Sequence, residues 1–339
     1  MPPFDIHAAF HRILADAQIS APLAAIFALT ELIQNSDAGT MFELVKALND
    51  GAEALTRQAT NPISINAGCE LFIAFVTLFP HDSANFTDLK KELIRQGQNY
   101  AAEALTYRKK IAELAFGFIK DGSVILTHSY SRVVMQTLLL AHKRKRISVF
   151  VTEARPRGLG IKTAEELTAA GVPSTVILDS AVAYVMDKVD FVLVGSEAVV
   201  ESGGLVNAVG SNQIAIIARA ANKPFYALAE SYKFHRLFPL SQYDLPSHNS
   251  KILSFPRPLP VNLPSTINSL TKQPSSDSST SDSSHPDPIS PPRITQEQIS
   301  ENNPDVDYTR PDLISLVFSD VGSLTPEGVS QYLVGMFAG

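Results

Sequence analysis

The chain has 339 residues, of which 45% are hydrophobic, which is enough for two domains with cores of their own. Its formal net charge of −6 argues against a nucleic-acid-binding protein, whose contact surface would be basic. No run of about 18 apolar residues predicts a membrane span, and the single cysteine, Cys69, cannot form an internal disulfide. We therefore expect a soluble cytosolic protein with no membrane or direct nucleic-acid partner.

Residues 1–121 have the pattern of a helical bundle. Apolar side chains recur at helical spacing, as over 41–55, where Asn49-Asp50-Gly51 predicts a possible break. Asp121-Gly122 is expected to end this half of the chain. The first domain is therefore predicted to span residues 1–121.

Two further helices are predicted in this half. A mostly apolar one covers 67–79 and would end at Pro80, so Cys69 is interpreted as a buried structural thiol rather than a nucleophile. A longer amphipathic helix follows Phe86, with Thr87 as its expected N-cap.

From Ser123 onward, short β-branched runs alternate with stretches of helical length. This pattern predicts buried parallel strands joined by crossover helices. Residues 122–339 are therefore expected to form a Rossmann-like α/β domain with a mainly parallel sheet, ending in a helix that opens at Pro326. The predicted strands are 124–126, 148–151, 175–178, 191–194, 225–229 and 313–317.

A serine-, proline- and aspartate-rich tract near 262–303 interrupts the second domain. It includes ten consecutive serine, threonine and aspartate residues at 275–284. Such a composition offers too little apolar surface to offset the entropy lost on ordering. We interpret the tract as a disordered surface insertion.

Polar residues follow several of the predicted strands. In doubly wound sheets, ligands bind where the carboxyl ends of the strands meet the following loops. These residues are therefore expected to surround one pocket, and helix N-termini there would favour an anion. The candidate ligand-binding residues at this edge are Thr127, Ser129, Ser131, Arg155 and Glu197.

Other motifs favour structural explanations. The GxG at 158–160 has Thr163 where a dinucleotide fingerprint needs a third glycine, and no P-loop or metal-ligand spacing occurs. His128 beside Ser129 could form a base and nucleophile, but neighbouring strand residues face opposite sides, which favours a hydrogen-bonded histidine under the sheet edge. The basic run 142–146 is interpreted as a solvated turn at a helix end, with phosphate recruitment as the alternative.

Three long motifs carry a family resemblance: THSYSRVV at 127–134, KPFYALAESYKFHRLFPL at 223–240, and VDYTRPDLISLVFSDVGSLTP at 306–326. They resemble the family that unites the alpha, beta and delta regulatory subunits of eukaryotic initiation factor 2B with the methylthioribose-1-phosphate and ribose-1,5-bisphosphate isomerases. Within this family, the alpha subunits are the most similar.

The chain departs from the isomerases at four positions of their site. Ser129 stands where they carry a cysteine, Glu197 where they carry the catalytic aspartate, Ala208 where they carry a lysine, and Ile19 where they carry a phosphate-binding arginine. A serine cannot supply a thiolate, and the arginine's bidentate phosphate contact is lost. Asn207 stands where the isomerases also carry an asparagine, so the resemblance adds it to the candidate ligand-binding residues. The resemblance implies a retained pocket without catalytic residues, cofactor or metal.

The resemblance implies a regulatory subunit of the guanine-nucleotide exchange factor for initiation factor 2. It would form a homodimer through its α/β domains and join two beta–gamma–delta–epsilon assemblies into a decamer. The helical half, with the delta subunit, would sense the phosphorylated alpha subunit of initiation factor 2. Thr40 and Glu43 are candidate contact residues, chosen for their expected exposure on a helix.

Two alternatives remain open at this point. One is a sugar-phosphate isomerase of the aldose–ketose type, and the other is a stand-alone sugar-phosphate or nucleotide sensor. In each case, the expected pocket ligand is a phosphorylated sugar or a nucleotide monophosphate, since the pocket keeps polar strand ends and helix N-termini.

Overall fold

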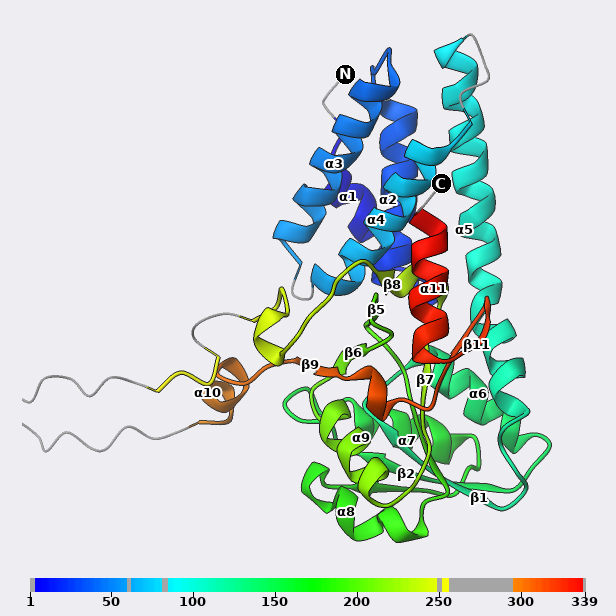
Figure 1. Cartoon of the computed structure of the whole chain (residues 1–339), viewed down its shortest axis with the longest axis vertical. Coiled ribbons are helices and arrows are strands. Elements are labelled where there is room, and N and C mark those ends of the chain that lie inside the picture. The colour runs from blue at the N-terminus through cyan, green and yellow to red at the C-terminus, as the bar shows by residue number, and fades with distance from the viewer. Residues whose placement is uncertain (1–3, 60–61, 81–84, 249–251, 256–294, 338–339) are drawn as a thin grey trace, which may run out of the picture. The chain divides into compact units, whose positions relative to one another are not determined.

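The structure is a computed structural model that describes residues 4–59, 62–80, 85–248, 252–255 and 295–337 (Figure 1). The chain divides into two compact units. The first comprises Met1–His248 and Pro304–Gly339 and contains both the helical part and the sheets. The second comprises Asn249–Asn303, and each unit is described by itself. No helix in the described ranges is long and apolar enough to cross a membrane.

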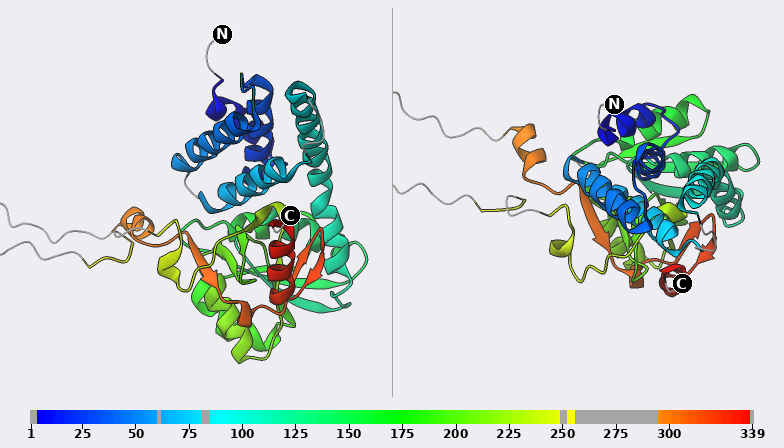
Figure 2. Two further views of the ribbon diagram at one scale, coloured as in Figure 1. Left: turned by 45° about the horizontal axis from the view of Figure 1, so that its top comes forward. Right: turned by 90° about the horizontal axis from the view of Figure 1, so that it is seen from above.

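The helical part of the first unit packs around a core of aliphatic and aromatic side chains. In the left view of Figure 2, α5 runs from these helices to the α/β part, where it packs against α6 and β10. The helices are α1 (Ile6–Leu14), α2 (Ala21–Asn35), α3 (Met41–Arg57), α4 (Pro62–Leu78) and α5 (Phe86–Phe116).

Two local expectations for these helices were wrong. Helix α3 continues through Gly51, because the missing side chain lets Leu32 and Ile6 pack close against the helix: a Cβ there would lie 2.8 Å and 2.9 Å from their terminal carbons. Helix α5 is capped by Asn85 rather than Thr87, since the Asn85 side chain accepts a hydrogen bond from the Thr87 amide at 3.0 Å.

Cys69 lies in α4 and is buried, as expected for a structural thiol. Burial, together with the neighbouring Glu70, raises the pKa of the thiol to about 12. The thiolate is therefore strongly disfavoured at neutral pH.

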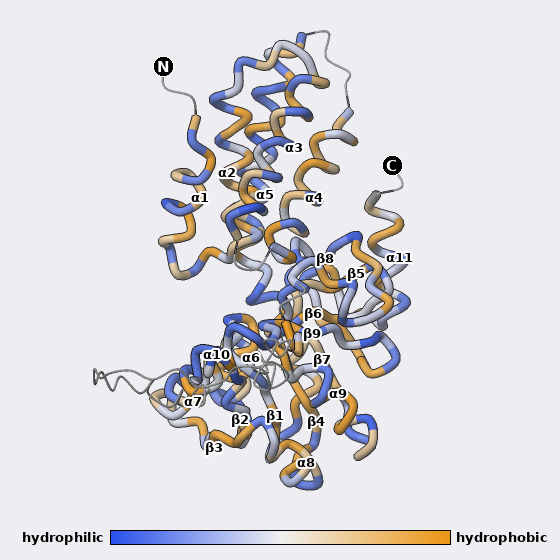
Figure 3. The backbone as a smooth tube through the Cα atoms, turned by 90° about the vertical axis from the view of Figure 1, so that its left-hand side faces the viewer, coloured by the Kyte–Doolittle hydropathy of each residue, from blue (hydrophilic) through white to orange (hydrophobic). Residues whose placement is uncertain are grey.

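A seven-stranded sheet with the order β11-β10-β7-β4-β1-β2-β3 forms the α/β part, and every pairing from β10 to β3 is parallel. This confirms the mainly parallel sheet, whose central strands carry hydrophobic stretches (Figure 3). Its strands are β1 (Ser123–His128), β2 (Ile147–Thr152), β3 (Ser174–Ile177), β4 (Phe191–Val194), β7 (Phe225–Leu228), β10 (Leu316–Ser319) and β11 (Gly322–Leu324). The connecting and flanking helices are α6 (Arg132–His142), α7 (Gly160–Ala169), α8 (Val182–Val185), α9 (Ser211–Ala220) and α11 (Pro326–Phe337).

The C-terminal part of this sheet differs from expectation. Leu313 ends a 3₁₀ turn, Pro311–Leu313, so β10 begins later than the predicted strand. The antiparallel strand β11 was not predicted. Pro326 does open α11, as the sequence pattern indicated. The predicted domain boundary at 121–122 falls between α5 and β1 and stays a prediction.

A second sheet, which the sequence pattern did not predict, has the order β8-β5-β6-β9. Its strands are β5 (Ala198–Val200), β6 (Leu205–Ala208), β8 (Phe234–His235) and β9 (Val306–Thr309). Ile63 of α4 shares a buried cluster with Val206 and Tyr308 of this sheet. The small sheet thus joins the helical part to the parallel sheet.

Residues 262–294 of the predicted disordered insertion lie outside the described residues. Its C-terminal end, residues 295–303, is described. These contain the helix α10 (Gln296–Glu301). Thr295 and Gln298 form a capping box at its start. The prediction of disorder was therefore wrong for this C-terminal end of the tract, where a capped helix forms.

Candidate ligand-binding site

A cavity of about 1050 Å³ lies at the carboxyl ends of β1, β4 and β7. The loops after these strands meet the beginning of α2 and the middle of α5 there. Its polar lining includes Ser20, Arg108, Ser131, Arg132, Ser196, Glu197, Asn207, Glu230 and Lys233. The position agrees with the rule that ligands bind at the carboxyl edge of such sheets.

Three of the six predicted pocket residues line this cavity: Ser131, Glu197 and Asn207. Ser131 is the N-cap of α6, and Glu197 follows β4. Asn207 in β6 is buried and donates a hydrogen bond to the Ser211 hydroxyl at 2.9 Å.

The other three predicted residues are not part of the lining. Thr127 is buried inside β1. Ser129 has a left-handed backbone with φ of 60° and is also buried. The Arg155 guanidinium is exposed and pairs with Glu153 at 3.1 Å.

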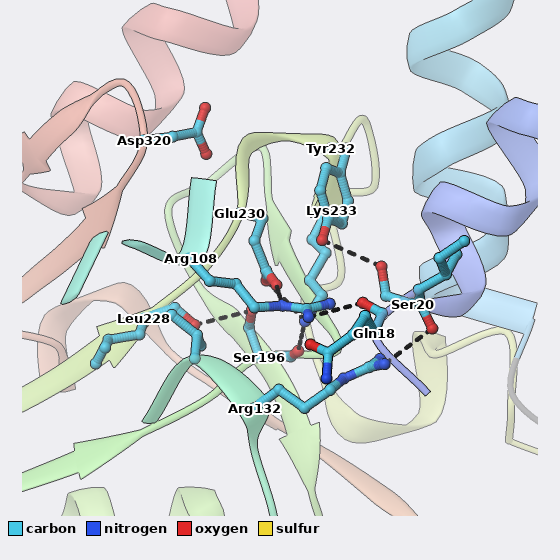
Figure 4. Close-up of polar contacts among 12 residues, drawn as sticks. Gln18, Ser20, Arg108, Arg132, Ser196, Leu228, Glu230, Tyr232, Lys233 and Asp320 are labelled. Atoms are coloured by element: carbon cyan, nitrogen blue, oxygen red, sulfur yellow. Dashed lines mark hydrogen bonds and ion pairs between the residues drawn. The ribbon is translucent and has the colours of Figure 1, made fainter. Parts of the chain in front are cut away.

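A buried ionic cluster at the cavity wall was missed by the sequence analysis (Figure 4). The Arg108 guanidinium lies 3.0 Å from one Glu230 carboxylate oxygen, and the Lys233 ammonium lies 3.0 Å from the other. Lys233 also donates to the Ser196 carbonyl at 2.8 Å. Burial raises the pKa of Glu230, but the two cations outweigh it and hold that pKa well below its usual range.

Arg132, the first residue of α6, is a further cation at the cavity. Its guanidinium donates to the Ala17 and Ile19 carbonyls at 2.7 and 2.8 Å. Within the described ranges, no carboxylate lies within ion-pair distance of it. Burial and the neighbouring Arg108 lower its pKa. It therefore holds the turn between α1 and α2 against the start of α6.

Two helix N-termini also face the cavity, those of α2 and α6. The side chains of the N-cap residues, Ser20 and Ser131, make no capping hydrogen bond, and Ser20 instead donates to the Tyr232 hydroxyl at 3.1 Å. The first-turn amides of a helix attract anions. Together with Arg132, these amides form a local environment suited to a phosphate group.

Behind Asn207, two buried groups hold the turn between β6 and α9. His128 contacts the Thr152 hydroxyl at 2.6 Å and the Val209 carbonyl at 2.9 Å, which confirms the structural interpretation of this histidine. Burial lowers its pKa. Asp307 accepts from the Gly210 amide at 2.7 Å, and burial raises its pKa to about 7.

The charged residues that were missed differ in the signal they offered. Glu230 lies two residues after the end of β7 and Arg132 directly follows Ser131, so the strand-end rule could have included both. Arg108 lies on a helix 122 residues before Glu230. Nothing in the local pattern indicated that it would reach the cavity.

Thr40 and Glu43 are exposed, but they also stabilise the start of α3. The Thr40 hydroxyl accepts from the Glu43 amide at 3.2 Å, and the Glu43 carboxylate accepts from the Gly39 amide at 2.8 Å. Phe42, between them, is 80% exposed and makes no such contact among the described bonds. Substituting Thr40 or Glu43 would therefore alter the start of α3 as well as its surface, whereas Phe42 is not part of the cap.

The basic run 142–146 has a structural role. The Lys145 ammonium donates to the Phe116 carbonyl at 3.1 Å and to the Ile119 carbonyl, which satisfies the end of α5. Arg146 pairs with Asp121 at 2.5 Å. These contacts favour the interpretation as a turn that supports a helix end.

Comparison with known proteins gives a consistent result. Residues 15–326 match the model of the Initiation factor 2 subunit family. "Translation initiation factor eIF2B subunit alpha" of Dictyostelium discoideum is 38% identical over 325 residues, covering 95% of this chain and 93% of the relative. "Ribose 1,5-bisphosphate isomerase" of Archaeoglobus fulgidus is 32% identical over 211 residues, covering 62% of this chain and 66% of the relative.

A solved structure supports the fold. A chain of the "tetrameric eIF2B-beta2-delta2 complex from C. thermophilum" superposes with a TM-score of 0.69 at 18% identity, covering 98% of this chain and 94% of that chain. The family motifs, the carboxyl-edge cavity and these similarities lead to one conclusion. The chain belongs to the initiation factor 2 subunit family.

Proposed function

We propose that this chain is the alpha-type regulatory subunit of initiation factor 2B, the guanine-nucleotide exchange factor for initiation factor 2. The observation that carries the proposal is the similarity to an alpha subunit over nearly the full length of both chains. In this proposal, the chain forms a homodimer that joins two beta–gamma–delta–epsilon assemblies. Its helical part senses the phosphorylated alpha subunit of initiation factor 2.

The geometry of the cavity supports a non-catalytic role. Ser129, which replaces the isomerases' cysteine, does not line the cavity. Glu230 is held ionised by Arg108 and Lys233, so it is a poor proton donor at neutral pH. General acid–base catalysis instead requires a group whose pKa lies near the working pH.

The same cavity is suited to a structural ligand, a phosphorylated sugar or a nucleotide monophosphate. Arg132, the Ser131 hydroxyl and the N-terminus of α6 would bind the phosphate. Ligand at about 100 times its dissociation constant should add about 2.7 kcal/mol of stability. A thermal-shift panel of such phosphates with Arg132→Met tests this role, and Arg155→Met serves as the matched control because Arg155 lies outside the lining.

The regulatory role is tested by measuring nucleotide release from initiation factor 2, phosphorylated or not, with complexes that contain or lack this chain. Removing the chain should leave part of the basal exchange and abolish its inhibition by the phosphorylated factor. Unchanged inhibition without the chain would contradict the assignment.

The proposed contact surface at the start of α3 needs a variant that spares the cap. Phe42→Ser should weaken inhibition without unfolding the protein, because the Phe42 side chain is exposed. Thr40→Ser keeps the capping oxygen and serves as a control, whereas Thr40→Ala should cost about 1 kcal/mol of stability through the lost cap. Full inhibition in complexes with Phe42→Ser would remove this surface from the proposal.

A sugar-phosphate isomerase remains the second candidate, favoured by the Glu197 carboxylate in the cavity and by the isomerase relatives. The purified chain should not interconvert methylthioribose-1-phosphate or ribose-1,5-bisphosphate above background. Turnover that disappears in Glu197→Ala would support the isomerase instead.

A further inference from the structure

A second cavity of about 550 Å³ shares no lining residue with the first. It is lined by residues of α4, α5 and α11 and of the turn between β10 and β11. Figure 1 shows how these elements are arranged. This volume is within the usual range for small-molecule sites. We define the aromatic cavity by the lining residues Phe72, Phe75, Phe79, Tyr100, Tyr107 and Tyr332, with one carboxylate, that of Asp320.

The aromatic rings lie close to one another. Phe75 lies between Phe72 and Phe79, with ring centroids 6.2 and 5.8 Å apart. On the other wall, the rings of Tyr100 and Tyr107 are 6.2 Å apart and nearly perpendicular. Aromatic faces carry partial negative charge and attract cations within about 6 Å.

Asp320 has only neutral hydrogen-bond donors around it. It accepts from the Ser231 amide and hydroxyl, both at 2.7 Å, and from the Ser319 hydroxyl at 3.3 Å. Across the described ranges, no lysine, arginine or histidine forms an ion pair with it. In Figure 4, no dashed line joins it to Arg108, Arg132 or Lys233.

These donors explain why the carboxylate faces the start of the 3₁₀ turn Ser231–Lys233, but they leave its charge uncompensated. Asp320 is partly buried, and taking a charge out of water without a counter-ion is costly. Burial raises the pKa of Asp320, and the nearby Glu230 adds to this. A cation inside the cavity would remove that penalty.

We propose that the aromatic cavity binds a small organic ammonium ion with an aromatic or aliphatic body. The ammonium group would pair with the Asp320 carboxylate and lie against the tyrosine rings, and the apolar body would contact Leu71 and the phenylalanines. The chemistry is opposite to that of the first cavity, whose cations suit a phosphate. The proposal does not depend on nucleotide exchange.

Isothermal titration calorimetry with the full chain tests whether the aromatic cavity binds an ammonium ion. The cationic probe is 4-phenylbutylamine, and its neutral counterpart is 4-phenylbutan-1-ol. The amine should bind more tightly than the alcohol. Asp320→Asn keeps an oxygen for the Ser231 amide. It should weaken binding of the amine by roughly tenfold to a hundredfold and leave the affinity for the alcohol unchanged. Asp187→Asn, an exposed carboxylate, is the matched control and should change neither.

A second variant, Ala74→Phe, tests the cavity without altering Asp320. Ala74 lines the cavity, so a larger side chain there should exclude both probes. Its thermal unfolding midpoint shows whether the fold is kept. Absence of amine binding to the unaltered chain, or equal binding of both probes that Asp320→Asn does not change, would overturn the proposal.

Discussion

At the scale of single residues, buried charges determine how this protein responds to pH. Glu230 is buried with two cations, whereas Asp307 is buried with backbone amides only. The first arrangement favours the ionised carboxylate and the second disfavours it. The two residues should therefore make opposite contributions to the pH dependence of stability.

Glu230 should stabilise the protein above the pKa of an unfolded glutamate, about 4.3. Its pKa in the fold is lowered to about 2, so this contribution should be lost as the pH falls from about 4.5 to 2. Arg108→Met should cost about 3 to 5 kcal/mol at neutral pH, because it leaves a buried carboxylate with Lys233 alone. Urea unfolding at several pH values measures both effects, and an unchanged free energy of unfolding in Arg108→Met would contradict them.

Asp307 should act in the opposite direction. Its pKa is raised to about 7, so the folded state holds a proton that the unfolded state releases near pH 4. Stability should therefore fall as the pH rises from 4 to 8. Asp307→Asn should remove this slope while keeping an oxygen for the Gly210 amide. Parallel slopes for the two proteins in urea unfolding would show that Asp307 does not titrate in this range.

At the scale of elements, close helix contacts depend on two glycines whose surroundings differ. A Cβ on Gly68 of α4 would lie 2.6 Å from the Pro22 carbonyl oxygen, whereas a Cβ on Gly335 of α11 would meet no atom within 4 Å. Backbone cannot yield as a flexible side chain can. The spacing of α2 and α4, which places the N-terminus of α2 at the cavity, therefore requires Gly68.

The two glycines make a matched pair of substitutions. Gly68→Ala should destabilise the protein by about 1 to 3 kcal/mol through the clash with Pro22. Gly335→Ala should be neutral or stabilising by up to about 1 kcal/mol, because alanine favours helix. Thermal and urea unfolding measure both changes in stability. A stabilising Gly68→Ala would mean that α2 and α4 can move apart at little cost in free energy.

At the scale of the whole molecule, an apolar surface follows the edge strand β3. Val176, Leu178 and Tyr184 are 43%, 60% and 87% exposed, and they lie within nine positions of one another in the sequence. Val176 lies in β3, Leu178 directly after it, and Tyr184 in α8. Exposed apolar groups on or beside an edge strand are typical of contact surfaces. We infer that the proposed homodimer uses this surface.

Leu178→Asp should therefore convert the dimer to a monomer without loss of the fold, since the side chain contributes little to the core. Ile216→Asp, a comparably exposed position on α9, is the control and should remain dimeric. Sedimentation velocity measures the mass, and circular dichroism the fold. A dimeric Leu178→Asp, or a chain that is monomeric without substitution, would contradict the inference.

Much of the fold could be predicted because its signals are local. The β-branched runs of β1, β2 and β4 and the proline that opens α11 lie within a few residues of the elements they specify. The carboxyl-edge rule likewise indicated Ser131 and Glu197, which line the cavity, whereas Asn207 was indicated only by the family resemblance. Ser129 does not line the cavity, and its left-handed backbone leaves no trace in the sequence pattern.

What only the tertiary structure decided involves partners distant in the sequence. In the second sheet, Asn207 pairs with Asp307, and at the cavity Arg108 pairs with Glu230, 122 residues further on. Periodicity reports which face of an element is buried, but not which other element buries it. Pairings of this kind form because packing brings short strands and long side chains together, so they are absent from any local pattern.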